Sequence, residues 1–296
     1  MKLLLFLPTY NEARSAHNLA KQLRRDPRIA HTLIVDDSDD PTNSAYATEI
    51  NDINTTIIRR TRAGKWSAWR IALEKARGYD GLIQSDSDLI IKNPHLLISK
   101  LGTHDLVTAY QDVKIPTTAD PISQRIGEVY RDAHLRLRAM RKFNMGGRFM
   151  ALSRRVTGTL LDKGFFLEPV PADDHVIGLA SAALGLRCRS IDCGVELTSP
   201  ATLREWVRYR SRQRGVIEWS ERYVASKIGE AERIREISRA DIKLTTASFL
   251  ASILRRTDPL NLLVLTILGI SSLLPHEDRA EWTTLTTTKP VTPHKF

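Results

Sequence analysis

Short apolar segments alternate with amphipathic helical patterns over the first 110 residues, and this alternation constrains the fold more than any other feature. The apolar segments predict strands at residues 3–7, 32–35, 56–58, 81–84 and 106–109. The segments 13–24 and 66–77 predict helices, because their apolar residues recur every three or four positions. Strands and helices that alternate in this way form βαβ units. We therefore expect an α/β fold with a mostly parallel central sheet flanked by helices.

The second half of the chain is predicted to be mainly helical. The elements predicted there are a strand at 149–152 and helices at 121–142, 173–184, 202–237 and 242–256. No strand pattern follows residue 200. The apolar segment 260–274 is short for a membrane-spanning helix, and a buried core helix is the alternative. The Thr- and Pro-rich segment 281–296 predicts a flexible tail.

Basic residues outnumber acidic residues in this chain. It has 44 Lys and Arg against 34 Asp and Glu, which gives a net charge of +10 and a pI of about 9.7. Such an excess favours an anionic partner: nucleic acid, an acidic lipid surface or a phosphorylated substrate. The hydrophobic fraction of 42% and the charged fraction of 26% exclude a disordered chain and a polytopic membrane protein.

The cysteine content and the N-terminus both bear on the cellular compartment. The chain has two cysteines, Cys188 and Cys193, and this number is too small for a disulfide framework or a zinc site. We therefore expect reduced thiols. The N-terminal apolar run stops at Pro8 without a small-residue cleavage site, which favours a buried strand over a signal peptide. We expect a cytoplasmic protein, with peripheral contact at the inner face of a membrane as an open alternative.

Two polar clusters follow the first two predicted strands, where ligands of parallel sheets bind. The first is residues 8–12, Pro-Thr-Tyr-Asn-Glu. Its backbone amides would suit an anion or a ring edge, although a helix start alone also explains the cluster. The second is residues 36–40, Asp-Asp-Ser-Asp-Asp. It predicts either a solvated turn or acceptors for a nucleobase and ribose.

Two further acidic clusters could carry chemistry. Asp86 and Asp88 follow the fourth predicted strand, where two carboxylates at this spacing can reach one hard cation that bridges to phosphates. A turn without a metal is the alternative. Asp173, Asp174 and His175 open a predicted helix. They either stabilise the helix N-terminus or supply a general base whose pKa is raised towards neutrality.

A cluster of arginines lies near the end of the sheet-forming part of the chain. Four arginines occupy seven positions: Arg208, Arg210, Arg212 and Arg214. They repel one another unless an anion lies among them, and guanidinium groups suit phosphate. A nucleic-acid backbone and a diphosphate both fit this pattern.

In this order, the clusters resemble those of the inverting glycosyltransferases of family 2, which bind nucleotide sugars with a GT-A fold. The resemblance extends over about residues 1–215 and includes Gly64-Lys65 at a helix start. It also includes Gly-Gly-Arg-Phe at 146–149, which resembles the acceptor-side floor of the family's site. The resemblance implies a transferase domain at 1–215, with a donor half to about 110 and an acceptor half beyond it. A helical extension would follow at 216–280.

The resemblance also implies roles for individual residues. Asp86 and Asp88 would hold Mg²⁺ or Mn²⁺. Asp173-Asp174 stands where the family has a Glu-Asp pair whose second carboxylate is the base, so Asp174 is the expected base. Thr9 and Asp37 would hold the nucleobase of a nucleotide sugar, with UDP favoured over GDP or dTDP. The implied donor-binding residues are Pro8, Thr9, Tyr10, Glu12, Asp36, Asp37, Lys65, Asp86, Arg210, Arg212 and Arg214.

The expected function is thus metal-dependent, inverting transfer of a sugar from a nucleotide sugar to an acceptor hydroxyl. The arginine segment lacks the family's Arg-Trp pair, so we expect a non-processive enzyme. The basic helix at 121–142 and the apolar segment 260–274 favour a lipid-linked sugar or polyprenyl phosphate as acceptor at a membrane surface. A hydroxylated base of DNA is the alternative acceptor. A nucleic-acid-binding protein without enzymatic activity is the third hypothesis.

Overall fold

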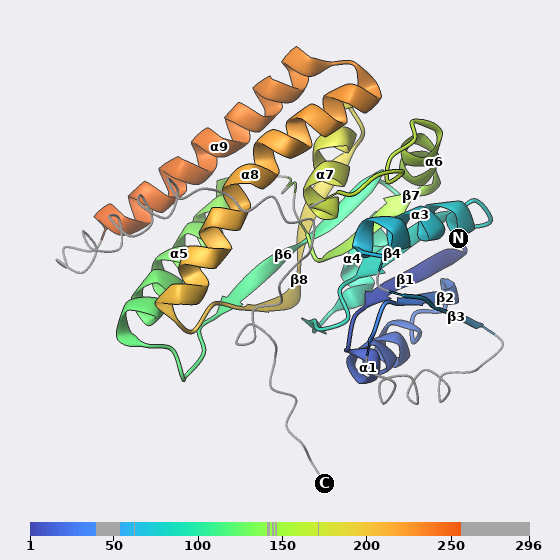
Figure 1. Cartoon of the computed structure of the whole chain (residues 1–296), viewed down its shortest axis with the longest axis horizontal. Helices are drawn as coiled ribbons and strands as arrows, with labels where there is room; N and C mark the ends of the chain where they lie inside the picture. The colour runs from blue at the N-terminus through green and yellow to red at the C-terminus, as the bar shows by residue number, and fades with distance from the viewer. Residues whose placement is uncertain are drawn as a thin grey trace, which may run out of the picture.

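The computed structural model describes residues 1–39, 54–61, 63–140, 143, 145, 147–170 and 172–255, without the side chains of residues 13 and 210–214. Its strands are β1 (Leu3–Thr9), β2 (Ile29–Asp36), β3 (Thr55–Arg59), β4 (Gly81–Ser85), β5 (Ile90–Ile91), β6 (Leu106–Lys114), β7 (Phe149–Ser153) and β8 (Cys188–Thr198). Its helices are α1 (Ala13–Leu23), α3 (Lys65–Ala76), α4 (Pro94–Lys100), α5 (Pro121–Met140), α6 (Arg154–Asp162), α7 (Asp173–Ala183), α8 (Leu203–Ile228) and α9 (Ala231–Leu254). Figure 1 shows their arrangement.

The strands form one sheet in the order β3-β2-β1-β4-β7-β6-β8-β5. Four pairs of strands are parallel: β1 with β2, β1 with β4, β2 with β3, and β6 with β8. β7 runs antiparallel to both of its neighbours, β4 and β6, and β5 runs antiparallel to β8. The expected α/β fold with a mostly parallel sheet is confirmed. The antiparallel β7 brings its first residue to the edge where β1, β2 and β4 end.

Helices cover both faces of the sheet, which explains why β1, inside the sheet, is apolar at nearly every position. In β1, Leu4 and Phe6 face a core shared with α3, α6 and α7. Leu3, Leu5 and Leu7 face a second core shared with α1 and α4. Successive side chains of a strand point to opposite faces, so a strand that is covered on both sides is apolar at every position.

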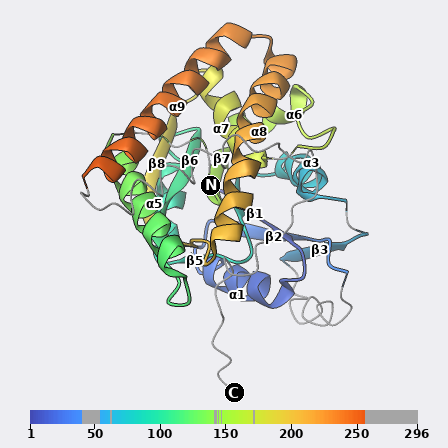
Figure 2. The ribbon, with the colours of Figure 1, turned by 60° about the vertical axis from the view of Figure 1, so that its left-hand side comes forward.

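The C-terminal helices form a separate layer over the half of the sheet that contains β6 and β8 (Figures 1 and 2). α5, α8 and α9 pack around an aromatic cluster that includes Tyr130, Trp206 and Phe249. α8 ends at Gly229, whose φ of 80° is left-handed backbone that glycine adopts without strain. In the described part of the chain, no helix is both long enough and apolar enough to cross a membrane.

Several elements differ from the sequence predictions. The helix predicted at 202–237 is divided at Gly229 into α8 and the start of α9, and α9 continues into the segment 242–256. The patterns did not predict β5, β8, α4 or α6. In β8 the buried residues are separated by half-buried or exposed ones, and the charged Arg189 and Asp192 are exposed, so its strand pattern is weak. α8 continues through residue 215, the boundary predicted for the transferase domain. The segments 260–274 and 281–296 lie outside the described residues.

Candidate active site

The polar clusters predicted after the strands meet at one edge of the sheet. The Asp37 N–H donates to the carbonyl of Thr9 at 3.0 Å, which joins the ends of β2 and β1. The Asp86 N–H donates to the carbonyl of Arg148 at 2.9 Å, which joins the end of β4 to the start of β7. The carboxyl ends of three parallel strands therefore lie beside Arg148, at the position where ligands of such sheets bind.

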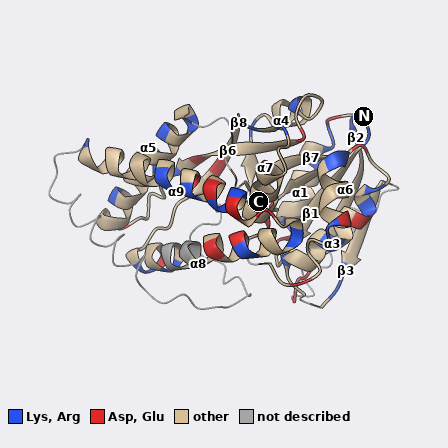
Figure 3. Cartoon of the chain, turned by 90° about the horizontal axis from the view of Figure 1, so that it is seen from above, with Lys and Arg blue, Asp and Glu red and all other residues tan. Residues whose placement is uncertain are grey.

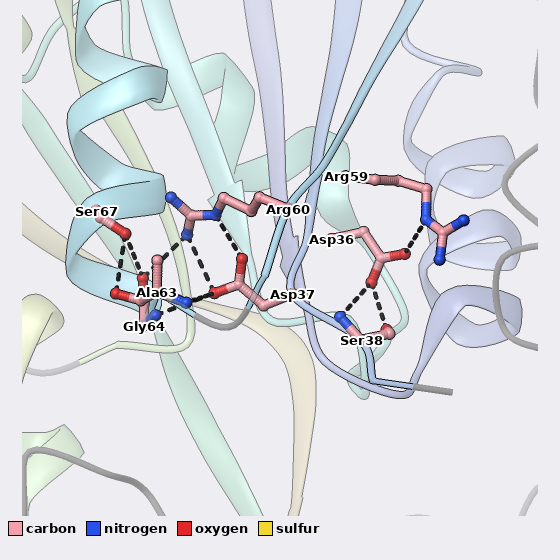
Figure 4. Close-up of polar contacts among 8 residues, drawn as sticks. All are labelled: Asp36, Asp37, Ser38, Arg59, Arg60, Ala63, Gly64 and Ser67. Atoms are coloured by element: carbon pink, nitrogen blue, oxygen red, sulfur yellow. Dashed lines mark hydrogen bonds and ion pairs between the residues drawn. The ribbon is translucent and has the colours of Figure 1, made fainter. Parts of the chain in front are cut away.

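The carboxylates that end β2 are buried and already paired (Figure 4). Asp37 accepts from Arg60 Nε at 2.5 Å, from Arg60 Nη2 at 3.1 Å and from the Gly64 N–H at 3.1 Å. Asp36 accepts from the N–H and hydroxyl of Ser38 and lies 3.7 Å from Arg59 Nε. Asp36 is 2% exposed and Asp37 is 7% exposed. These two acids therefore do not belong to a solvated turn.

The first predicted cluster lies beside this pair. Thr9 is buried, and within the described residues its Oγ1 has no hydrogen-bond partner. The Tyr10 hydroxyl donates to Asp39 at 2.6 Å. Glu12 accepts from the Ser87 hydroxyl at 2.6 Å, which links this cluster to the Asp86–Asp88 turn.

Lys65, the first residue of α3, connects two of the acidic clusters. Its Nζ lies 2.7 Å from Asp86 Oδ1 and 3.0 Å from Asp173 Oδ2. Burial lowers the pKa of Lys65, but the carboxylates of Asp173, Asp86 and Asp174 outweigh burial and hold that pKa above its ordinary value. Lys65 is therefore a positive charge between Asp86, a predicted metal ligand, and Asp173, the neighbour of the predicted base Asp174.

Arg148 faces the same carboxylates from the start of β7. Its Nε lies 3.9 Å from Asp86 Oδ2 and its Nη1 lies 3.7 Å from Asp88 Oδ2. Burial raises the pKa of Asp86, but Lys65 and Arg148 outweigh burial and hold that pKa below its ordinary value. For Asp88, burial and the charges of Asp86 and Glu12 outweigh Arg148 and raise the pKa to about 6.

Asp173 and Asp174 open α7 and have different environments. Asp173 is 5% exposed and accepts from the indole N–H of Trp69 at 2.5 Å. Asp174 accepts from the Gly147 N–H at 3.1 Å and from the His175 N–H at 2.8 Å. Burial, then the charge of Asp173, raises the pKa of Asp174 to about 6. Burial lowers the pKa of His175 to about 4, so its imidazole is neutral at pH 7.

The candidate ligands for a metal ion at this site are the carboxylates of Asp86 and Asp88. The described residues contain no group of three or more His, Cys, Asp or Glu side chains placed to hold a metal ion. Asp86 and Asp88 supply two carboxylates, and Mg²⁺ or Mn²⁺ at phosphate-binding sites is commonly held by one or two carboxylates, substrate phosphates and water. The donor set therefore fits a cation that arrives with a phosphorylated substrate.

Some site residues were not predicted from the sequence, and others remain undescribed. Trp69 is predicted only as part of a helix face, Arg60 is not predicted at all, and Arg148 appears only within the acceptor-floor segment. The position of Arg60 depends on β3 ending at this edge, and that of Arg148 depends on the antiparallel β7 beginning there. Sequence spacing shows neither. Arg210, Arg212 and Arg214 lie on α8, with side chains outside the described residues.

Comparison with known proteins establishes the fold. No protein-family model matches the sequence, and no curated protein is significantly similar to it. Among solved structures, a mannosyltransferase of Pyrobaculum calidifontis in complex with GDP-Man and Mn²⁺ is 18% identical, with a TM-score of 0.53, covering 91% of this chain and 80% of its own. Glucosyl-3-phosphoglycerate synthase of Mycobacterium tuberculosis in complex with UDP is 18% identical, with a TM-score of 0.51. The match covers 77% of this chain and 80% of the synthase chain. The chain therefore has the GT-A fold of these glycosyltransferases, as expected.

Proposed function

We propose that the protein is a metal-dependent, inverting glycosyltransferase that moves a sugar from a nucleotide sugar to an acceptor hydroxyl. One observation carries the proposal: Asp86, Asp88, Asp173 and Asp174 gather around Lys65 and Arg148 at the ligand-binding edge of a GT-A sheet. Carboxylates that are buried beside one another and beside two cations are costly to maintain for structure alone. Of the two similar structures, the mannosyltransferase was solved with GDP-Man and Mn²⁺ and the synthase with UDP, which is consistent with this proposal.

The donor would bind across the ends of β1, β2 and β4. Thr9 and Asp37 border the position of the nucleobase, and Arg60 holds Asp37 in place. Asp86 and Asp88 would hold Mg²⁺ or Mn²⁺ against the diphosphate, and the cation would stabilise the charge of the leaving group. Lys65 and Arg148 add positive charge at the same place. Lys65, Arg148 and a cation held by Asp86 and Asp88 would each lower the free energy needed to separate the nucleoside diphosphate from the sugar.

Asp174 would act as the general base. With a pKa of about 6 its carboxylate is mostly ionised at pH 7, yet still basic enough to take a proton from a hydroxyl. The N–H groups of Gly147 and His175 orient it. Asp173 accepts from Trp69 and Lys65, so its role is to position α7 and Lys65. A base that activates the acceptor on the face opposite the leaving group inverts the anomeric configuration.

The acceptor that we propose is lipid-linked. α5 exposes Leu135 and Met140, and α9 exposes Leu250 and Leu254. α5 also carries four arginines against two acids, and apolar and basic side chains together suit an anionic membrane surface. α9 mixes four basic with three acidic residues (Figure 3), which favours this surface over the purely basic stripe that would follow a nucleic-acid backbone.

The first experiment is a thermal-shift panel of UDP, GDP, dTDP and CMP, each with and without Mn²⁺. A ligand at 100 times its dissociation constant adds about 2.7 kcal/mol to the free energy of unfolding. We expect a Mn²⁺-dependent rise in Tm with one nucleoside diphosphate. If none of the nucleotides changes Tm, the proposed function is wrong. The anomeric configuration of the product, read by NMR, then tests inversion.

Vesicle flotation tests the acceptor surface. We expect the protein to float with vesicles that contain anionic lipid and to remain in solution with neutral vesicles. Binding to DNA that weakens steeply with salt, in the absence of lipid, would favour the DNA acceptor instead.

A further inference from the structure

The two residues predicted to hold a divalent cation already face protein cations. Lys65 Nζ lies 2.7 Å from Asp86 Oδ1, and the Gln84 side-chain amide donates to the same oxygen at 3.1 Å. Arg148 lies 3.9 Å from the other oxygen of Asp86 and 3.7 Å from Asp88 Oδ2. Two carboxylates thus face two fixed positive charges. Lys65 and Arg148 therefore offset part of the negative charge that would attract a free metal ion to Asp86 and Asp88.

A bare divalent cation meets two obstacles at this position. It must displace the ammonium of Lys65 from Asp86, and it then lies close to the displaced ammonium and to Arg148, which repel it. It also gains few protein ligands. Within the described residues, no group of three or more His, Cys, Asp or Glu side chains is placed to hold a metal ion. Mg²⁺ and Mn²⁺ lose their water reluctantly when few ligands replace it.

A nucleoside diphosphate removes both obstacles. Its oxygens are strong acceptors for ammonium and guanidinium groups, so Lys65 and Arg148 can turn from the carboxylates to the phosphates. Asp86 and Asp88 are then left with negative charge for the cation, and the phosphates complete its ligand set. Lys65 keeps Asp173 at 3.0 Å as its second partner, so it does not need to leave the site.

We propose that Lys65 and Arg148 are internal counter-ions that make cation binding depend on the nucleotide. The protein alone binds Mn²⁺ or Mg²⁺ weakly, and the nucleoside diphosphate creates the site by drawing these two side chains away from the carboxylates. This inference rests on the proposed function for the identity of the ligand. It concerns binding only, so it is testable without turnover.

Isothermal titration calorimetry of the full chain with MnCl₂, alone and with saturating UDP or GDP, measures the effect. For the native protein we expect Mn²⁺ to bind at least about tenfold more weakly alone than with nucleotide, equivalent to about 1.4 kcal/mol. The variant Lys65→Met should bind Mn²⁺ alone at least about tenfold more tightly than the native protein. The matched control is Lys100→Met, an exposed lysine at the end of α4, which should leave both affinities unchanged.

A second variant tests the same inference in case Lys65→Met does not fold. Arg148→Gln removes the other counter-ion while it keeps hydrogen-bonding capacity, and circular dichroism checks that each variant is folded. The inference is overturned if native protein binds Mn²⁺ equally well with and without nucleotide, or if neither variant gains affinity for Mn²⁺ alone. Failure of every nucleotide to bind would count against the proposed function, while the titration of Lys65→Met with Mn²⁺ alone would still test the counter-ion role.

Discussion

Replacing Asp174 with asparagine separates catalysis from stability, because the structure predicts opposite effects on the two. Asn keeps the size of the side chain and can still accept one of the two N–H groups, from Gly147 or His175, that Asp174 accepts. It cannot take a proton from an acceptor hydroxyl. General bases contribute about 10²- to 10⁴-fold to the rate, so we expect Asp174→Asn to lower kcat by that factor and to leave donor binding largely intact.

The stability change follows from the pKa of Asp174. Burial, then the charge of Asp173, raises this pKa from its ordinary value of 3.8 to about 6. The folded protein therefore disfavours the ionised carboxylate by up to about 3 kcal/mol. This cost is absent below pH 3.8, grows as pH rises to about 6, and is complete above pH 6. Asp174→Asn removes the cost, so the variant should be more stable than the native protein by up to about 3 kcal/mol at pH 7.5.

Three measurements check this reasoning together. Release of nucleoside diphosphate gives kcat, calorimetry gives donor affinity, and urea unfolding at several pH values gives stability. In the native enzyme kcat should fall to about half or less near pH 6 and to about a tenth or less near pH 5, because Asp174 and Asp88 both have a pKa of about 6 and become protonated there. The control Asp162→Asn, at the exposed end of α6, should change none of these. A variant Asp174→Asn that keeps more than about a tenth of the activity, or that is destabilised at pH 7.5, would refute the assignment.

Three other substitutions test the framework of the site. Trp69→Phe keeps the buried ring but removes the indole N–H that reaches α7; urea unfolding should show a loss of about 1–3 kcal/mol, and an unchanged midpoint would contradict the contact. Arg60→Met breaks the half-buried bidentate pair with Asp37 and should lower the free energy of unfolding by about 3 kcal/mol. The side chain of Arg59 is 48% exposed, so Arg59→Met should lower it by less than about 1 kcal/mol. Equal losses in the two variants would count against the pairing of Arg60 with Asp37. Gly178→Ala places a Cβ 2.1 Å from the backbone oxygen of Met145. The variant should lose at least about 1–3 kcal/mol of unfolding free energy, together with activity. Gly158→Ala has open space in α6 and should stabilise by about 0.5–1 kcal/mol, and both are measured by thermal unfolding.

Local sequence patterns were sufficient for the strands and helices that surround the site. β1 is apolar at nearly every position because both of its faces are covered, and polar clusters lie at the ends of β1, β2 and β4. Patterns failed for β8, in which Arg189, Asp192 and Glu196 give the appearance of a surface segment. The separation of α8 from α9 depends on one left-handed glycine, Gly229, inside a continuous helical pattern.

The chemistry of the site was only partly contained in the sequence. The order of Asp37, Asp86, Asp88 and Asp174 along the chain predicted a site at the edge where the strands end, because ligands of parallel sheets bind there. The partners of these residues were decided by tertiary structure. Arg60 reaches Asp37 across 23 residues, and Trp69 reaches Asp173 across 104.

The sequence by itself determined which residue types stand at the end of each strand, and with them the α/β fold, because apolar periodicity and turn chemistry are local properties. Only the tertiary structure decided that the antiparallel β7 places Arg148 beside Asp86 and Asp88, and that α3 inserts Lys65 between Asp86 and Asp173. Charge balance and pKa depend on distances between elements far apart in the chain. Such distances exist only once the sheet has formed.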